Sequence, residues 1–148
     1  MLKSIEGNFD NLEVHELLIK HFNELRSVSP EGSAHVLDIA GLKDPSIKFW
    51  SLWKKDDLVG SGALKFLDKE HGEFKSIRVS DKFRNKGNGP EVINHLINEA
   101  KKLNIKRLSL ETGAGNFFLT ARKLFNKSGF RTCEPFSHYK NDINSVYM

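Results

Sequence analysis

Apolar and polar residues alternate along this chain with two different periods. Runs rich in aliphatic and aromatic residues, bounded by polar or glycine-containing turns, predict β-strands. These strands are expected at 2–6, 47–53, 58–67, 73–79, 106–112, around 131–136 and at 145–148. Because only short polar turns separate the second, third and fourth runs, the middle of the chain is predicted to form an antiparallel meander.

Apolar residues at helical spacing predict three helices between these strands. Asp10 and Glu13 have the spacing of a capping box, so the first helix is expected to be capped by Asp10. The second helix is predicted over 90–103 and the third over 116–127. The connection 27–44 contains proline and glycine residues and is predicted to be irregular.

Length and composition restrict the class of protein. The chain has 148 residues, 39% hydrophobic and 28% charged, with a formal net charge of +4. A chain of this length is expected to form one domain, 1–148. No apolar run approaches the ~20 residues that cross a bilayer, and no signal-like stretch is present, so a membrane protein is not expected. With Cys133 as the only cysteine, an internal disulfide is excluded and a cytoplasmic protein is favoured.

A basic, glycine-containing loop stands between the fourth predicted strand and the second predicted helix. It consists of Arg84, Asn85, Lys86, Gly87, Asn88 and Gly89, and Pro90 follows it. Glycine lets the backbone approach a ligand closely, and proline fits the first turn of a helix. Free N–H groups at a helix start favour an anion, and a pyrophosphate suits such a site. The loop matches neither common nucleotide fingerprint, so by itself it indicates only an anion site.

Two motifs give this loop a family context. The first, Arg84-x-x-Gly87-x-Gly89 between a strand and a helix, resembles the acyl-CoA loop of the GCN5-related N-acetyltransferase (GNAT) superfamily. The second, Ala121-x-x-Leu124-Phe125-x-x-x-Gly129-Phe130, resembles the A-x-x-L-Y-x-x-x-G-F helix ending of the same superfamily. The segments 72–79 and 145–148 resemble the fourth and last strands of small bacterial-type members.

The resemblance covers nearly the whole chain and implies a fold. That fold is of the α/β (α+β) class, with a mixed, mostly antiparallel central sheet of about six to seven strands and flanking helices. Its fourth and fifth strands are expected to splay apart and admit the pantetheine arm of the coenzyme.

The resemblance also implies acetyl-CoA as co-substrate, without a metal. The backbone of β-strand residues 77–79 would hold the pantetheine arm like an added strand, and the N–H of Ile77 or Val79 would polarise the thioester carbonyl. No spacing of histidine, cysteine or carboxylate residues indicates a metal site. The residues expected to contact acetyl-CoA are Ile77, Arg78, Val79, Arg84, Asn85, Lys86, Gly87, Asn88, Gly89, Pro90, Asn116 and Lys123.

Transfer of the acetyl group to an amine requires a base. Several members of the family carry a general-base glutamate at the position of Glu73, and strand alternation predicts that Glu73 shares a face with Ile77. Glu111, at the end of the fifth predicted strand, is the alternative base. The tyrosine that usually serves as general acid is replaced by Phe125, so Tyr139, Tyr147 or water is expected to protonate the thiolate.

The acceptor is expected to be a primary amine on a small molecule or a peptide. His35, Asp38 and Thr112 are the candidate acceptor contacts. Because Phe125 has no proton to donate, a catalytically degenerate CoA-binding or sensing module is a second hypothesis. Basic residues are interleaved with acidic ones and no recognition motif is present, so nucleic acid is not an expected partner. A homodimer is compatible with the resemblance.

Overall fold

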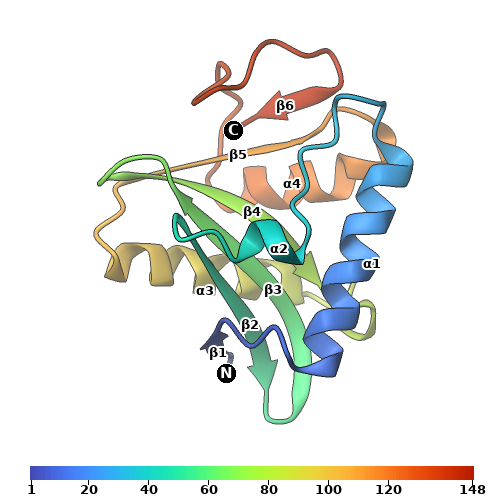
Figure 1. The fold of residues 1–148 in the computed structure, drawn as a ribbon, viewed down its shortest axis with the longest axis vertical. Helices are drawn as coiled ribbons and strands as arrows, with labels where there is room; N and C mark the ends of the chain where they lie inside the picture. Colours follow the sequence, from blue (N-terminus) through green and yellow to red (C-terminus); the bar gives the residue numbers. More distant parts are fainter.

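The computed structural model describes residues 1–148, and a six-stranded sheet runs through the molecule (Figure 1). The strands lie in sequence order, and all neighbours are antiparallel except β4 and β5, which are parallel. Their bounds are β1 Lys3–Glu6, β2 Ile47–Lys54, β3 Asp57–Phe66, β4 His71–Val79, β5 Arg107–Gly113 and β6 Ser145–Tyr147. The predicted mixed, mostly antiparallel sheet is therefore confirmed.

Four α-helices flank the sheet, two on each face. They are α1 Leu12–Val28, α2 Ile39–Leu42, α3 Asn88–Lys102 and α4 Leu119–Lys127, with short 3-10 turns at Asp81–Phe83 and Asn116–Phe118. The predicted cap of α1 is wrong by one residue, because the side chain of Asn11, not Asp10, accepts a hydrogen bond from the Val14 N–H. None of these helices is long and apolar enough to cross a membrane.

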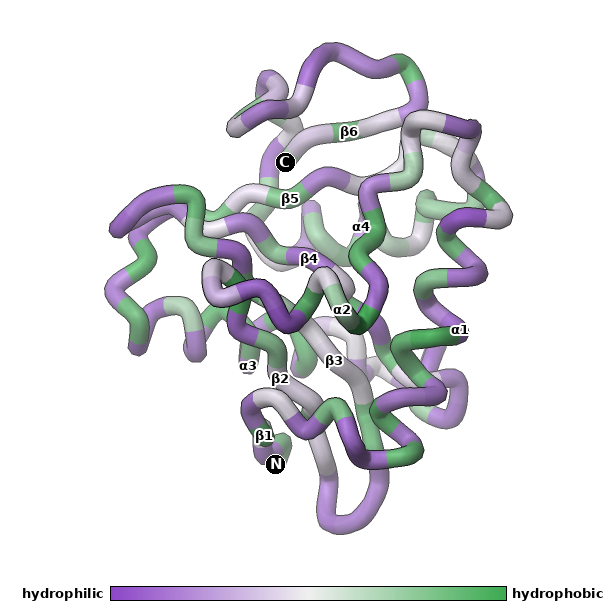
Figure 2. The backbone as a smooth tube through the Cα atoms, in the orientation of Figure 1, coloured by the Kyte–Doolittle hydropathy of each residue, from purple (hydrophilic) through white to green (hydrophobic).

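Alternation along the strands divides the interior into two hydrophobic clusters. Phe49 of β2 packs with residues of α1 and α2, whereas its neighbour Trp50 packs with residues of α3 and α4. Hydrophilic residues gather at the turn between β2 and β3, while both hydrophobic and hydrophilic residues occur along α1 (Figure 2). We call the two sides of the sheet the α1 face and the α3 face.

β4 and β5 start side by side and then diverge. Their parallel pairing runs from His71↔Arg107 to Phe74↔Leu110 and stops there, although β4 continues to Val79. The predicted splaying of the fourth and fifth strands is thus observed. β5 turns instead to β6, which pairs with its last three residues.

A bulge in β4 accompanies the divergence. Ala63 of β3 is opposite Lys75, but Ser61 is opposite Arg78, so β4 contains an extra residue there. Ser76 lies inside this irregularity with a φ of 53°, in the left-handed region. The extra residue reverses the alternation of side chains beyond it.

The bulge corrects one prediction from the sequence. Ile77 packs against the cluster on the α3 face, as does Phe74. Glu73 precedes Phe74 and therefore points to the α1 face. Glu73 and Ile77 are on opposite faces of the sheet, and the prediction that they share a face is wrong.

The C-terminal segment differs from the prediction in one strand. Residues 131–136 form no strand, although the Cys133 N–H donates to the Tyr147 carbonyl oxygen at 2.8 Å. Phe136, Tyr139 and Tyr147 instead form a small buried cluster of their own. The segment therefore folds as an irregular cover held by aromatic packing, with only β6 joining the sheet.

Candidate functional site

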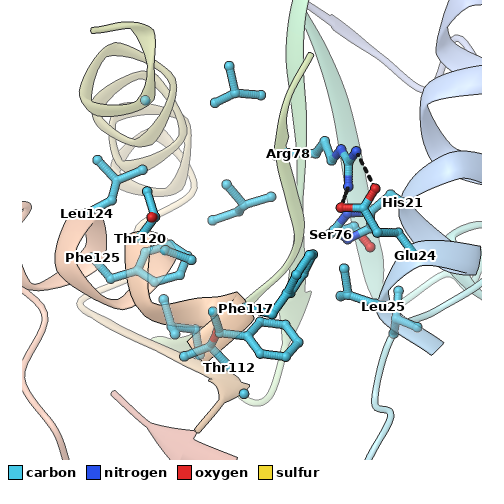
Figure 3. Close-up of a pocket in the computed structure, with 18 of the residues that line it drawn as sticks. His21, Glu24, Leu25, Ser76, Arg78, Thr112, Phe117, Thr120, Leu124 and Phe125 are labelled. Atoms are coloured by element: carbon cyan, nitrogen blue, oxygen red, sulfur yellow. Dashed lines mark hydrogen bonds and ion pairs between the residues drawn. The ribbon is translucent and has the colours of Figure 1, made fainter. Parts of the chain in front are cut away.

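A cleft opens where β4 and β5 separate, with a cavity volume of about 550 Å³. Its walls come from α1, the 33–36 connection, the diverging ends of β4 and β5, the 83–90 loop and α4 (Figure 3). Because the gap lies within the sheet, one cleft is bordered by elements of both faces. No group of three or more histidine, cysteine or acidic side chains is arranged to hold a metal ion.

The glycine loop borders the cleft at the start of α3. Gly87 precedes the helix with a φ of 81° in the left-handed region, and no side chain caps the first amides of α3. Of the loop residues expected to contact the coenzyme, Arg84, Asn85, Gly87, Gly89 and Pro90 line the cleft. Uncapped amides and the positive end of a helix dipole favour an anion, so this end of the cleft is suited to one.

Two loop residues predicted to contact the coenzyme are outside the lining. Lys86 is exposed away from the cleft. Asn88 is buried, where its amide donates to the Phe83 carbonyl oxygen at 3.2 Å and accepts from Lys54 Nζ at 3.0 Å. Asn88 therefore fixes the loop against the sheet by its side chain.

The α4 side of the cleft is mostly apolar. Phe125 lines the cleft and packs edge-to-face on Phe130, with ring centroids 5.9 Å apart. Asn116 and Lys123, both predicted coenzyme contacts, are exposed and outside the lining. The other lining residues of this side were not predicted from the sequence; they are Phe117, Phe118, Thr120, Ala121 and Leu124. The sequence feature that could have indicated them is the aromatic pair Phe117 and Phe118, which follows the glycine-containing end of β5.

Residues 77–79 of β4 line the cleft as predicted, but the side chain of Arg78 has a separate role. Its guanidinium donates to both carboxylate oxygens of Glu24 on α1, at 3.3 and 3.2 Å, and lies 3.7 Å from Asp81. The hydrogen bond from Arg78 holds the pKa of Glu24 below its usual value. This ion pair, in which Arg78 is buried and Glu24 is partly buried, joins α1 to β4 beside the cleft.

His21 lines the cleft beside this pair (Figure 3). Burial, with the nearby Arg78 charge, lowers the pKa of His21 to about 4. The imidazole is therefore neutral at pH 7 in the folded protein. His21 is spaced with the apolar residues of α1 and lies buried at the edge of the cleft.

The lowered pKa of His21 predicts a loss of stability in mild acid. The unfolded imidazole gains a proton below its ordinary pKa of about 6.5, whereas the folded one resists until about pH 4. The contribution is therefore present above about pH 6.5 and is lost as the pH falls. Linkage gives a decrease of about 2 kcal/mol in unfolding free energy between about pH 7 and about pH 5. Urea unfolding at both pH values measures it.

A matched pair of variants assigns this pH dependence. His21→Gln should reduce it by most of the predicted amount, and His15→Gln, on the exposed side of α1, should leave it unchanged. An unaltered pH dependence in His21→Gln would contradict the assignment.

Glu73 is enclosed and does not line the cleft. Its side chain is 1% exposed, and Oε2 accepts from the Tyr139 hydroxyl at 2.5 Å and from Lys75 Nζ at 3.3 Å. Burial and the adjacent Glu73 carboxylate raise the pKa of Tyr139. Tyr139 is also outside the lining, so the structure directs its proton to Glu73 and gives no support to Tyr139 as the general acid.

Glu111 lines the cleft on β5. Burial raises its pKa, although a hydrogen bond of 2.8 Å from the Ser145 hydroxyl partly opposes the shift. A carboxyl group of raised pKa in a cleft is a candidate for proton transfer. The structure therefore brings the alternative base, and not Glu73, to the cavity wall.

Two of the three candidate acceptor contacts line the cleft, and the third does not. His35 and Thr112 line the cleft, and the His35 ring packs edge-to-face on Tyr139 with centroids 5.1 Å apart. Asp38 is outside the lining, where its carboxylate accepts from the Gly41 N–H at 2.8 Å and caps α2. The α1 wall was not predicted from the sequence, because nothing in its helical pattern indicates that one edge faces a cavity.

Comparisons with known proteins agree with this architecture. Residues 11–130 match the family model described as the acetyltransferase (GNAT) family. The chain is 46% identical to the uncharacterized N-acetyltransferase YsnE of Bacillus subtilis, over 92% of this chain and 90% of that protein. It is 38% identical to the uncharacterized N-acetyltransferase YedL of Escherichia coli, over 91% and 85%. A Bacillus subtilis acetyltransferase solved in complex with CoA has a TM-score of 0.71 and 21% identity, with 99% of this chain and 96% of that chain covered.

The family assignment rests on the match along most of the chain and on the curated relatives, and the structural likeness supports the fold. The first sequence motif forms the uncapped glycine loop at the start of α3, and the second forms α4 and the turn that ends it. The chain belongs to the GNAT family of acetyltransferases and is an acyltransferase.

Proposed function

We propose that this protein transfers the acetyl group of acetyl-CoA directly to a primary amine on a small molecule or peptide. The observation that carries the proposal is the cleft between β4 and β5, which joins a site suited to an anion at one end to the partly buried carboxylate of Glu111 at the other. The two ends suit the coenzyme pyrophosphate and the acceptor amine, respectively.

The coenzyme would lie along β4 as an additional strand. The amides at the start of α3 would hold its pyrophosphate, and the unpaired edge of β4 at residues 77–79 would hydrogen-bond the pantetheine arm. CoA or acetyl-CoA is bound in solved structures that share this fold, with TM-scores of 0.71 and 0.65. An N–H of Ile77 or Val79 would polarise the thioester carbonyl.

Of the two candidate bases, the geometry favours Glu111. It lines the cleft and has a raised pKa, whereas Glu73 is covered by Lys75 and Tyr139. Glu111 would accept the proton of the amine as nitrogen attacks the acetyl carbon, directly or through water. The carbon–sulfur bond then breaks, and the thiolate takes a proton from water, because Phe125 has none to give.

The same Phe125 motivates the second candidate function, a CoA-binding or sensing module without turnover. The two functions share the coenzyme site and differ in whether an amine is consumed. A thiolate is a good leaving group at neutral pH, so loss of the tyrosine acid does not by itself abolish transfer.

The proposal predicts stabilisation by coenzyme and release of thiol with an amine. Acetyl-CoA should raise the melting temperature in a concentration-dependent way, and free adenosine should raise it far less. A panel of primary amines with acetyl-CoA should then release free CoA, measured with a thiol reagent. Stabilisation without thiol release across the panel would favour the sensing module, and no stabilisation by millimolar acetyl-CoA would contradict both functions.

A further inference from the structure

We infer that the acceptor is an amino acid or a similar small molecule that carries a carboxylate beside its amine, and that Lys75 binds this carboxylate opposite Glu111. The inference rests on the proposed function, because it takes the cleft between β4 and β5 as the acetyl-transfer site. It adds the chemical class of the acceptor and a specificity residue.

Strand register places Lys75 and Glu111 across the cleft from each other. The last paired residues of the two parallel strands are Phe74 and Leu110, which both belong to the cluster on the α3 face. The next residue of each strand therefore points to the α1 face, and these residues are Lys75 and Glu111. Both line the cavity at the point where the strands begin to separate.

The two side chains are not engaged with each other. No ion pair within 4.0 Å joins them; Lys75 Nζ donates instead to Glu73 Oε2 at 3.3 Å and to the Tyr139 hydroxyl at 3.1 Å. Glu111 accepts from the Ser145 hydroxyl. The carboxylate of Glu111 and the ammonium group of Lys75 are thus fixed separately, on neighbouring strands. This arrangement is complementary to a ligand that carries both an amine and a carboxylate.

Lys75 retains a donor for that ligand. An ammonium group has three N–H donors, and Lys75 uses two of them, on Glu73 and Tyr139. Its side chain is only 10% exposed, and the Tyr139 ring lies 5.9 Å from Nζ. In such a water-poor site a charge-assisted hydrogen bond to a carboxylate is strong.

The same contacts assign a role to Glu73 and Tyr139, which do not line the cleft. Glu73 is buried, and together with Tyr139 it holds the ammonium group of Lys75 in one position. They act as positioning residues, since neither lines the cavity. The buried carboxylate beneath the lysine also offsets the cost of keeping a cation there without ligand.

The charges of the whole lining agree with a zwitterionic acceptor better than with a polyamine. The charged residues of the lining are Glu24, Lys75, Arg78, Arg84 and Glu111. Glu24 is bound by Arg78, which leaves Glu111 as the acidic residue free of a basic partner within 4.0 Å. A polycation would need several free carboxylates, whereas the unpaired carboxylate of Glu111 and the remaining N–H donor of Lys75 match one amine and one carboxylate.

The first test needs only the wild-type protein. Several amino acids should each be compared with the amine that results from their decarboxylation, because the pair differs chiefly in the carboxylate. Thiol release from acetyl-CoA should give a kcat/KM about 10- to 100-fold higher for the amino acid. Equal or higher kcat/KM for the decarboxylated amines would overturn the inference and leave the proposed acetyl transfer standing. Failure of every amine and amino acid would instead count against the proposed function.

Variants of Lys75 connect this preference to the residue. Lys75→Met should remove most of the preference, that is, most of the difference in kcat/KM between the amino acid and its decarboxylated amine, through a higher KM for the amino acid, and Lys75→Arg should retain part of it. Lys101→Met, on the exposed side of α3, is the matched control and should keep the full preference. Lys75→Met leaves the buried carboxylate of Glu73 without its cationic partner. The double variant Lys75→Met/Glu73→Gln removes both charges, and it should be assayed with the same amino acids and decarboxylated amines. A preference that persists in a folded Lys75→Met protein would show that Lys75 does not bind the carboxylate.

Discussion

Glu111→Gln is expected to lower kcat by about 10²–10⁴-fold while the affinity for acetyl-CoA stays unchanged. Glutamine keeps the size of the side chain and an oxygen that can accept from the Ser145 hydroxyl, as Glu111 does at 2.8 Å. It removes only the ability to take a proton from the amine. Initial rates with a verified acceptor, and a separate acetyl-CoA binding isotherm, measure the two quantities.

The dependence of kcat on pH provides a second test of Glu111 as the base. Burial raises the pKa of Glu111 above its ordinary value, and the base works in its ionised form. Wild-type kcat should therefore rise with pH through a value higher than that of an exposed glutamate. At alkaline pH the acceptor loses its proton without help, so the difference between the wild-type and Glu111→Gln proteins should shrink. A constant difference at every pH would indicate a structural effect of the substitution.

Glu73→Gln is the matched comparison, because Glu73 is the other candidate base. If Glu73 positions Lys75, its neutralisation should act mainly on the KM for the acceptor and less on kcat. A larger loss of kcat in Glu73→Gln than in Glu111→Gln would reverse the assignment and make Glu73 the base. Both variants retain the shape of the side chain, so their comparison separates charge from packing.

The choice between these two carboxylates shows where prediction from the sequence ends. Alternation along a regular strand places residues 73 and 77 on one face, and this rule would have put Glu73 toward the coenzyme. One additional residue at the Ser76 bulge reverses the side-chain direction. No residue in the segment 73–79 marks the bulge, since serine at a φ of 53° is uncommon and the sequence contains no glycine or proline there.

Features governed by local chemistry were predictable. Most strands and the helices α1, α3 and α4 follow from apolar periodicity, and the glycine loop lies at the start of α3 as its residues indicate. The short helix α2 was not predicted, because it lies in the connection 27–44 that was expected to be irregular. The walls of the cleft depend on distant segments, which periodicity does not report. Phe117 on the β5–α4 connection and His21 on α1 line one cavity, although 95 other residues separate them in the chain. The strand predicted at 131–136 is absent for a similar reason, because Phe136 packs with Tyr139 and Tyr147 without forming a ladder.

Gly87 and Gly89 of the glycine loop resist replacement by a larger residue for different structural reasons. At Gly89 a Cβ atom would lie 2.8 Å from Cδ2 of Leu124, so a side chain there would disturb the contact between α3 and α4. At Gly87 a Cβ atom would meet nothing within 4 Å, but the φ of 81° is unfavourable for any L-residue. Gly87 therefore gives the cleaner test of the loop.

Gly87→Val is expected to weaken acetyl-CoA binding by at least about tenfold and to leave the fold intact. Valine disfavours the left-handed conformation by about 1–2 kcal/mol or more, so the loop should relax to another backbone geometry. That change moves the uncapped amides at the start of α3 away from the position at which they would hold a pyrophosphate. Calorimetric titration with acetyl-CoA measures the loss, and circular dichroism establishes that the variant is folded.

Gly7→Val is the control, because Gly7 has a φ of 77° and equally open space around its Cβ position but lies outside the cleft. Both substitutions should lower the melting temperature by a similar amount, since both impose the same backbone strain. Only Gly87→Val should change the affinity for acetyl-CoA. If the two variants lose affinity equally, the effect comes from general destabilisation; if neither does, the loop at α3 does not bind the coenzyme. A selective loss in Gly87→Val ties the affinity to the backbone amides of this loop, because glycine contributes no side-chain contact that the substitution could remove.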